Sequence, residues 1–261
     1  MRNIIKTAML AVATGMSCGA IGQAADQQTR PTIVLVHGAF AESASWNGVI
    51  GELSKDGYTA LAAANPLRSV ADDAAAVAAV IRSIPGPIVL VGHSYGGPVI
   101  TEAANGNSNV KALVYVAAFT PETGESSLSL TGKFPGSTLG EALVTTALPG
   151  GGQDLYIRPE RFHDQFAADV SEEEARLMAA TQRPVAQAAL AEPSGAASWK
   201  TLPSYAIYGS ADRNIPPAVM NFMAKRSHAV KTVVIEGASH ALMVSHPREV
   251  ASLIEEAASA N

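Results

Sequence analysis

A serine between two glycines ends an apolar run of the chain, in the segment Gly92-His93-Ser94-Tyr95-Gly96. The preceding run, 88–91, is typical of a buried strand, and a helix-compatible segment, 98–105, follows. A strand-to-helix turn of this kind holds its serine in a strained conformation that only small neighbours permit, and it points the hydroxyl outward. Ser94 is therefore our candidate nucleophile. The alternative is a plain glycine turn without chemistry.

A serine hydroxyl is a poor nucleophile at neutral pH, so Ser94 needs a base within hydrogen-bond reach and an acid that orients the base. In chains built on this turn the acid and then the histidine follow the serine, each just after a strand. Of the six histidines, His240 fits best, because it follows an expected strand, 231–236, across the small turn Gly237-Ala238-Ser239. The alternative for any histidine is a purely structural role.

Asp212 is our candidate for the acid. It lies just beyond the expected strand 205–209 and hence beside the loop that carries His240. The alternative is an aspartate that only shapes the turn before Pro216-Pro217. Glu236 is the second candidate, but it is still within its expected strand and too near His240 along the chain.

A tetrahedral oxyanion needs two backbone donors, and one of them is the N–H of the residue after the nucleophile, Tyr95. The other is expected from the loop after the first strand, where Ala39 is our first choice and Phe40 the second. Phe40 and Tyr95 adjoin these loops, so we expect Phe40 to line the substrate pocket. The remaining aromatic candidates, Trp46, Phe119 and Trp199, are assigned to the core.

Strand and helix patterns alternate through most of the chain, which predicts an α/β fold with a mostly parallel sheet of about six strands flanked by helices. The expected strands are 32–37, 58–63, 88–93, 110–118, 205–209 and 231–236. The expected helices are 46–55 with Ser45 as its cap, 69–84 opened by Ser69, 98–105, 216–227 and 247–258.

The alternation stops between Thr120 and about Thr201. This stretch holds loops rich in Pro, Gly and Ser and two helical pieces, 160–169 and 171–190. Because the strand and helix rhythm resumes directly afterwards, we expect a helical cap inserted over the catalytic face and not a separate domain.

The N-terminal segment, residues 1–24, has the pattern of a secretory signal peptide. Arg2 and Lys6 precede a short apolar stretch, 8–13, and Gly22-Gln23-Ala24 resembles a small-x-small cleavage site. The stretch is shorter than the roughly 20 apolar residues of a membrane span, which disfavours the alternative of a membrane anchor. We therefore expect an exported protein, periplasmic or secreted, whose single domain comprises residues 25–261.

Composition narrows the chemistry further. Loss of Arg2 and Lys6 takes the net charge from −5 to −7, and the only cysteine, Cys18, lies inside the signal segment. A lipid anchor on Cys18 is disfavoured because Gly15 stands where such sites carry a leucine-like residue. The acidic balance argues against nucleic acid, and neither histidine pairs at metal spacing nor a phosphate loop occurs, so no cofactor, metal or stable membrane association is expected.

Taken together, the segments 37–39 and 92–97 with Asp212 and His240 resemble the α/β-hydrolase superfamily over residues 31–258. The segment from His37 through Trp46 is similar to the branch that holds plant methylesterases, hydroxynitrile lyases and small bacterial esterases. The resemblance implies a serine carboxylesterase with a cap, acting on a small ester through an acyl-enzyme. It also implies Ser94, Asp212 and His240 as a catalytic triad, with Ala39 and Tyr95 as oxyanion donors.

Two positions separate hydrolysis from lyase chemistry within that branch. The lyases carry a threonine after the first-strand histidine and a lysine after the catalytic histidine, whereas this chain has Gly38 and Ala241. Hydrolysis is therefore favoured over a cofactor-free lyase, and a perhydrolase side activity stays open. A non-catalytic exported binding protein is disfavoured, because every expected catalytic residue type is present.

Overall fold

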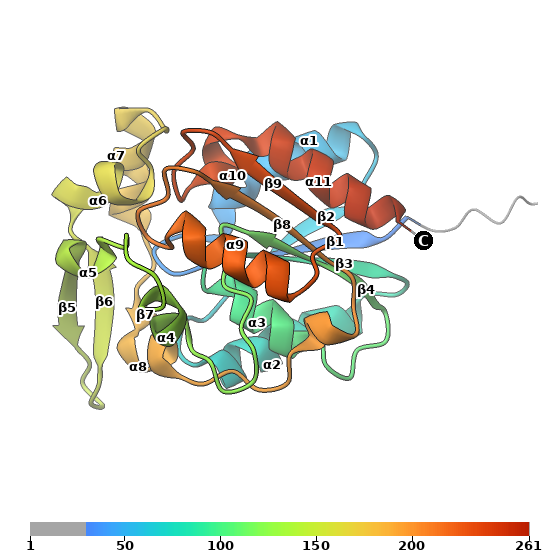
Figure 1. Ribbon diagram of the computed structural model, residues 1–261, viewed down its shortest axis with the longest axis horizontal. Coiled ribbons are helices and arrows are strands. Elements are labelled where there is room, and N and C mark those ends of the chain that lie inside the picture. The colour runs from blue at the N-terminus through green and yellow to red at the C-terminus, as the bar shows by residue number, and fades with distance from the viewer. Residues whose placement is uncertain (1–29, 261) are drawn as a thin grey trace, which may run out of the picture.

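The computed structural model describes residues 30–260, so the expected signal segment and Cys18 lie outside the described residues. Its centre is a six-stranded sheet in the order β2-β1-β3-β4-β8-β9, in which every neighbouring pair is parallel. This confirms the predicted α/β fold (Figure 1). The strands are β1 (Thr32–Val36), β2 (Ala60–Ala63), β3 (Ile88–His93), β4 (Val110–Val116), β8 (Ser204–Gly209) and β9 (Lys231–Ile235).

Helices cover both faces of this sheet. α2 and α3 pack together on one face, and α1 and α11 pack together on the other (Figure 1). The helices outside the cap are α1 (Asn47–Lys55), α2 (Val70–Ser83), α3 (Gly96–Ala103), α9 (Pro217–Arg226), α10 (Leu242–Ser245) and α11 (Pro247–Ser259). The hydroxyl of Ser69 caps α2 by accepting a hydrogen bond from the N–H of Asp72 at 3.0 Å. Ser45 does not cap α1, because it lies inside a 3-10 turn, Ser43–Trp46, that precedes the helix.

The cap lies between β4 and β8 and holds five short helices and a small sheet of its own. The helices are α4 (Ser127–Thr131), α5 (Leu139–Ala142), α6 (Pro159–Phe166), α7 (Glu172–Thr181) and α8 (Gln187–Ala191). The antiparallel sheet, in the order β5-β6-β7, is formed by β5 (Leu143–Ala147), β6 (Gln153–Ile157) and β7 (Val185–Ala186), and it was not expected from the sequence. The single helix predicted over 171–190 is wrong: Pro184 has no N–H for a helical bond, and the chain continues as β7 and α8.

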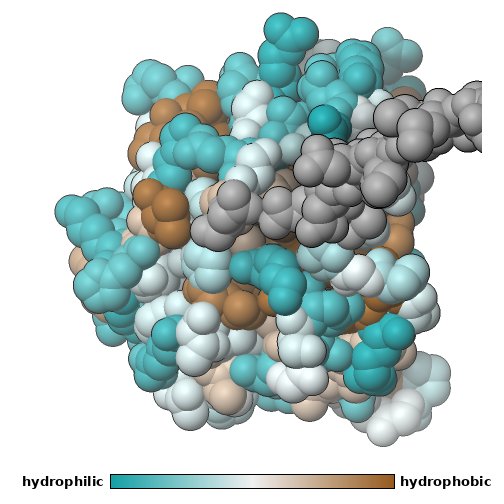
Figure 2. All heavy atoms as spheres, turned by 90° about the vertical axis from the view of Figure 1, so that its right-hand side faces the viewer, coloured by the Kyte–Doolittle hydropathy of each residue, from teal (hydrophilic) through white to brown (hydrophobic). Residues whose placement is uncertain are grey.

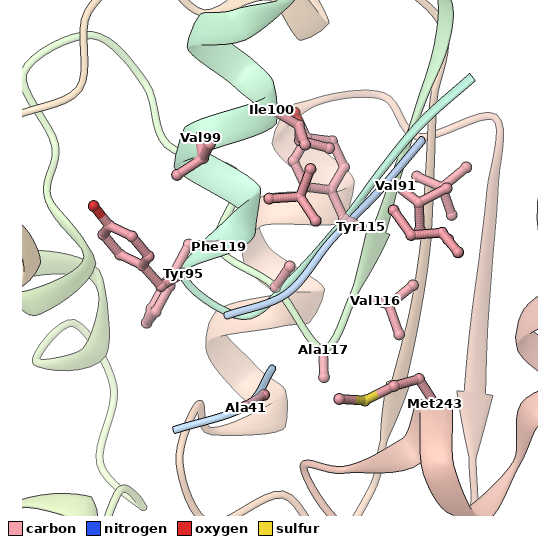
Figure 3. Packing of buried hydrophobic residues seen from close by; sticks show 14 of the residues in the cluster. Ala41, Val91, Tyr95, Val99, Ile100, Tyr115, Val116, Ala117, Phe119 and Met243 are labelled. Carbon is pink, nitrogen blue, oxygen red and sulfur yellow. The ribbon is translucent and has the colours of Figure 1, made fainter. Parts of the chain in front are cut away.

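The core is made by strands whose side chains are excluded from water on both faces. Every residue of β3 and β8 is buried, as expected for central strands of a parallel sheet covered by helices. Figure 3 shows Ile100 of α3 and Tyr115 of β4 within this layer. At the end opposite the cap, the surface mixes hydrophilic residues with small hydrophobic patches (Figure 2). Among the helices of residues 30–260, none has both the length and the apolar character needed to cross a bilayer.

The strand order brings the predicted site residues to one edge of the sheet. Ala39 follows β1, Ser94 follows β3, Asp212 follows β8 and His240 follows β9. Because all these strands are parallel, their carboxyl ends lie at the same edge, and β1 neighbours β3 as β8 neighbours β9.

Candidate active site

Ser94 occupies a strained turn between β3 and α3. Its φ is 53°, a left-handed conformation that non-glycine residues rarely adopt, and its residue surface is 7% exposed. The turn closes only because its neighbours lack side chains: a Cβ on Gly92 would lie 2.6 Å from the carbonyl oxygen of Gly96, and one on Gly96 would lie 2.6 Å from that of Val36. The turn therefore holds a serine in a strained conformation at the end of a buried strand.

His240 and Asp212 form a buried pair. The Nδ1 atom of His240 lies 2.6 Å from Oδ2 of Asp212, and the two residues are 1% and 4% exposed. The other carboxylate oxygen, Oδ1, accepts hydrogen bonds from the N–H groups of Asn214 and Ile215 at 2.8 and 2.9 Å. Asp212 thus shapes its turn with one oxygen and contacts the imidazole with the other. Its environment therefore has features of both interpretations of the sequence, the acid that orients His240 and the aspartate that shapes a turn.

The loop around His240 is held from two further sides. The Nε2–H of His93 donates to the backbone oxygen of His240 at 3.1 Å, with the two ring centroids 4.7 Å apart. Burial holds the pKa of His93 well below its usual range, so this ring is a neutral donor. Phe166 of α6 accepts the N–H of Ala241 at 3.0 Å and sets its ring edge-on to His240 at 5.0 Å. The cap therefore contributes directly to the position of the imidazole, which no sequence pattern indicated.

Ser94 and His240 are not joined by a hydrogen bond between their side chains within residues 30–260. The His240 ring instead packs against His93, the residue directly before the serine. Hydrogen bonds of catalytic groups are often long or poorly aligned before substrate binds, so this separation is compatible with catalysis. Glu236, the second candidate for the acid, is exposed just beyond β9 and makes no described bond to His240.

The two predicted oxyanion donors border the same pocket as Ser94. In the described part of the chain, the N–H groups of Ala39 and Tyr95 donate to no protein acceptor, whereas the N–H of Phe40 donates to the carbonyl oxygen of Arg183 at 3.0 Å. Close approach of this loop depends on Gly38, because a Cβ there would lie 2.6 Å from Cβ of Ser94. The geometry therefore favours Ala39 over Phe40 as a donor.

His37 fixes the loop that carries Ala39. Its Nδ1–H donates to the carbonyl oxygen of Gly38 at 2.9 Å, and its Nε2 accepts the N–H of Asn65 at 3.2 Å. The Asn65 amide in turn donates to the carbonyl oxygen of His37 at 2.9 Å. Burial lowers the pKa of His37 to about 4, so the ring stays neutral. The sequence did not lead us to name Asn65 as a site residue. The signal that could have indicated it is its position just after β2, the strand that pairs with β1.

The side chain of Tyr95 links the serine turn to the cap. Its hydroxyl donates to Oδ2 of buried Asp73 at 2.9 Å, and Oδ1 of Asp73 accepts the N–H of Arg68 at 3.1 Å. Burial raises the pKa of Asp73. The guanidinium of Arg68 then reaches Asp154 of β6 at 2.7 Å and the carbonyl oxygen of Pro184 at 2.9 Å. Figure 3 shows the hydroxyl end of Tyr95 directed away from Val91 and the other strand residues drawn.

A pocket of about 390 Å³ opens between the serine turn and the cap. No charged residue is among those that line it. The lining residues outside the cap are Ala39, Phe40, Ser94, Tyr95, Phe119, Asn214 and Ile215. The lining residues of the cap are Ser127, Leu128, Thr131, Ser137, Leu139, Gly140, Leu143, Thr145, Leu155, Gln187 and Leu190. Phe119, assigned to the core from the sequence, is part of this wall, whereas Trp46 and Trp199 are buried elsewhere. No cluster of residues suited to hold a metal ion occurs in residues 30–260.

Several known proteins are similar to this chain in sequence or in structure. The protein "Alpha/beta hydrolase nvfD" of Aspergillus novofumigatus is 27% identical over 250 residues, which cover 88% of this chain and 97% of that protein. The crystal structure of polyneuridine aldehyde esterase superposes with a TM-score of 0.76 at 22% identity, covering 87% of this chain and 98% of that one. The methylesterase MES16 from Arabidopsis gives a TM-score of 0.73 at 17% identity over 88% and 99% of the two chains.

These structures share the fold with this protein, at identities too low to transfer an activity. The decisive match is to a family model, described as the alpha/beta hydrolase family, which spans residues 33–253. That span contains the serine turn, the His240–Asp212 pair and the whole cap. The protein belongs to the alpha/beta hydrolase family.

Proposed function

We propose that this protein hydrolyses neutral carboxylic esters of moderate size, with Ser94 as nucleophile, His240 as general base and Asp212 as the orienting acid. The observation that carries the proposal is the buried 2.6 Å contact between His240 and Asp212 at the sheet edge where strained Ser94 faces a pocket. A buried carboxylate bonded to Nδ1 leaves Nε2 of the same imidazole as the proton acceptor.

The reaction proceeds in two halves. Ser94 Oγ attacks the ester carbonyl carbon while Nε2 of His240 takes the hydroxyl proton, and Asp212 stabilises the imidazolium. The negative charge on the carbonyl oxygen is stabilised by the N–H groups of Ala39 and Tyr95. His240 then returns the proton to the departing alkoxide, which leaves as the alcohol. In the second half a water molecule gives one proton to His240 while its OH group bonds to the acyl carbon. The bond between the acyl carbon and Ser94 Oγ then breaks and His240 returns the proton to Oγ, which releases the acid and restores Ser94.

The lining of the pocket supports a neutral, mainly apolar substrate. Its largest side chains are aliphatic or aromatic, among them Phe40, Phe119, Leu155 and Ile215, and it contains no charged group to pair with an ionised substrate. Transfer of an unpaired carboxylate or ammonium into such surroundings costs several kcal/mol or more. The names of two similar structures, polyneuridine aldehyde esterase and a methylesterase from Arabidopsis, agree with ester hydrolysis.

A panel of esters tests the proposal. Purified protein is assayed with p-nitrophenyl esters of increasing acyl length and with one matched pair whose acyl chain ends in a methyl group or in a carboxylate. The expected result is turnover of the neutral esters, loss of activity in Ser94→Ala, and at least a 100-fold lower kcat/KM for the charged member, since about 2.7 kcal/mol already corresponds to that factor. Full activity of Ser94→Ala, or equal rates for the matched pair, contradicts the mechanism or the substrate class respectively.

We also propose that residues 1–24 are removed on export. Support comes from the order of Arg2 and Lys6, the short apolar stretch and Gly22-Gln23-Ala24. N-terminal sequencing of exported protein is expected to begin near Ala25. A chain that begins at lipid-modified Cys18, or an uncleaved cytoplasmic chain, contradicts this proposal.

A further inference from the structure

One buried hydroxyl in the pocket wall has no hydrogen-bond partner. Ser127, the first residue of α4, lines the pocket that Ser94 also lines, and it is 3% exposed. Within residues 30–260 its Oγ contacts no donor or acceptor. A buried hydroxyl without a partner costs about 1–3 kcal/mol relative to a bonded one, so Ser127 is an unfavourable choice for an empty apolar wall.

The neighbouring hydroxyls of α4 are all engaged with the protein backbone. Ser126 Oγ accepts the N–H of Ser129 at 3.1 Å, and Ser129 Oγ accepts the N–H of Ser126 at 2.9 Å, so the two residues form a capping box. Thr131 Oγ1 donates to the carbonyl oxygen of Ser127 at 2.9 Å. Ser127 therefore differs from them in having its hydroxyl unused while its side chain borders the pocket.

Two other polar residues of the same wall make hydrogen bonds within the protein. Ser137 Oγ donates to the carbonyl oxygen of Asn214 at 2.9 Å, and Oδ1 of Asn214 accepts from the amide of Gln165 at 2.7 Å. Among the residues that line the pocket, Ser127 is thus the one that has a fully buried side-chain polar atom without a hydrogen-bond partner within residues 30–260.

We propose that Ser127 is a specificity-determining residue whose hydroxyl binds an oxygen atom on the otherwise apolar part of the substrate. This inference rests on the proposed ester hydrolysis and narrows it to neutral esters that carry an ether, ketone or hydroxyl oxygen apart from the ester group. A serine hydroxyl both donates and accepts, so each of these oxygens satisfies it. Three leucines that line the same pocket, Leu128, Leu139 and Leu190, offer apolar surface to the hydrocarbon part.

The test uses pairs of esters that differ by one atom. Each pair has a ring CH₂ replaced by an ether oxygen, for example cyclohexyl and tetrahydropyranyl rings, placed in turn on the acyl and on the alcohol side. The values of kcat/KM are measured for wild type, for Ser127→Ala and for Thr131→Val, a matched control that removes a pocket-lining hydroxyl already bonded within α4. For each pair, the ratio of kcat/KM for the ether ester to kcat/KM for the hydrocarbon ester in wild type is divided by the same ratio in Ser127→Ala. This double ratio isolates the contact between Ser127 and the ether oxygen, because the different hydration of the two rings cancels.

The expected result is that, for at least one pair, Ser127→Ala lowers kcat/KM of the ether-containing ester about 3- to 10-fold relative to its hydrocarbon partner, the effect of one net hydrogen bond. Hydrolysis of the hydrocarbon ester is retained, and Thr131→Val changes both members alike. Equal effects of Ser127→Ala on both members of every pair overturn the assignment while ester hydrolysis stands. If wild type hydrolyses neither member of any pair, this assignment fails, and turnover of the p-nitrophenyl esters then shows whether ester hydrolysis itself stands.

Discussion

Oδ2 of Asp212 lies 2.6 Å from Nδ1 of His240, and neither side chain reaches the solvent. The remaining oxygen of Asp212 is held by two backbone N–H groups of the turn that follows. The carboxylate is therefore fixed on both sides, and it fixes the tautomer of the imidazole by accepting the proton on Nδ1.

Replacement of Asp212 by asparagine tests this pairing. The oxygen of the amide is able to keep the turn, but its NH₂ group then faces Nδ1 of His240 and favours the tautomer that carries no lone pair on Nε2. We expect Asp212→Asn to stay folded by circular dichroism and to lose roughly 10⁴-fold in kcat.

Glu236→Gln is the matched control, because Glu236 is a nearby acid that is exposed and has no described bond to His240. It is expected to keep kcat within a few-fold of wild type. In a His240→Ala background, the added Asp212→Asn change is expected to cost little, because no base remains to be oriented. Large activity loss in Glu236→Gln with retained activity in Asp212→Asn assigns the acid to Glu236.

A methyl group at Gly38 is expected to displace the oxyanion loop. The new Cβ would lie 2.6 Å from Cβ of Ser94 and 2.7 Å from the carbonyl oxygen of His93, neither of which moves easily. We expect Gly38→Ala to lower kcat by about 10²-fold, the cost of roughly an ångström of misplacement, and to lower the free energy of unfolding by about 1–3 kcal/mol.

Gly140→Ala is the control for that substitution. Gly140 also lines the pocket, but an added Cβ meets no atom within 4 Å. Urea unfolding and kcat of Gly140→Ala are expected to stay near wild type. Equal losses in the two variants indicate that the loss in Gly38→Ala does not come from contact with Ser94.

Acid is expected to destabilise the protein through its buried neutral histidines. Burial lowers the pKa of His37 from 6.5 to about 4 and that of His93 in the same direction. Above pH 6.5 His37 is neutral in both the folded and the unfolded chain. As the pH falls from 6.5 to 4, the unfolded chain takes up the proton and the folded one does not, so the free energy of unfolding falls, by on the order of 3 kcal/mol for His37 alone.

Asp73 opposes this trend, because its raised pKa lets the folded state take up a proton first. The raised pKa values of Glu102 and Glu255 act in the same direction as that of Asp73, whereas the lowered pKa values of Glu125 and Asp169 add to the effect of the histidines. Because the pKa values of both histidines are lowered far, urea unfolding at pH 7, 5.5 and 4.5 is expected to give decreasing stability. His37→Gln is expected to be less stable than wild type at pH 7, since contacts with Gly38 and Asn65 are lost, but to show a shallower decrease. A wild-type profile that is flat over this range contradicts the account.

The sequence was sufficient for the sheet because its strands are continuous apolar runs, such as Ile88–His93, that only a doubly covered parallel sheet buries. The turn at Ser94 was also predictable, because Gly92 and Gly96 are fixed by local sterics. The positions of Asp212 and His240 were predictable for a different reason, because each residue follows a strand in the order of elements along the chain.

The cap was harder to predict because its strands depend on partners and not on their own pattern. β5 is exposed along nearly its whole length, and β7 has only two residues, so neither shows an alternation that stands out from a loop. Phe166 packs against His240, and Ser127 lines the same pocket as Ser94, although the two residues of each pair are far apart in the sequence. Such contacts are fixed by packing, which periodicity and composition do not encode.

Covalent labelling identifies the nucleophile, which we propose is Ser94. Purified protein is treated with a fluorophosphonate, and the intact mass and the modified peptide are measured alongside residual esterase activity, with Ser94→Ala and Ser127→Ala treated in parallel. One adduct is expected, on Ser94, formed in step with the loss of activity, absent from Ser94→Ala and retained in Ser127→Ala. An adduct on another residue, or full activity in a protein quantitatively modified at Ser94, would contradict this assignment.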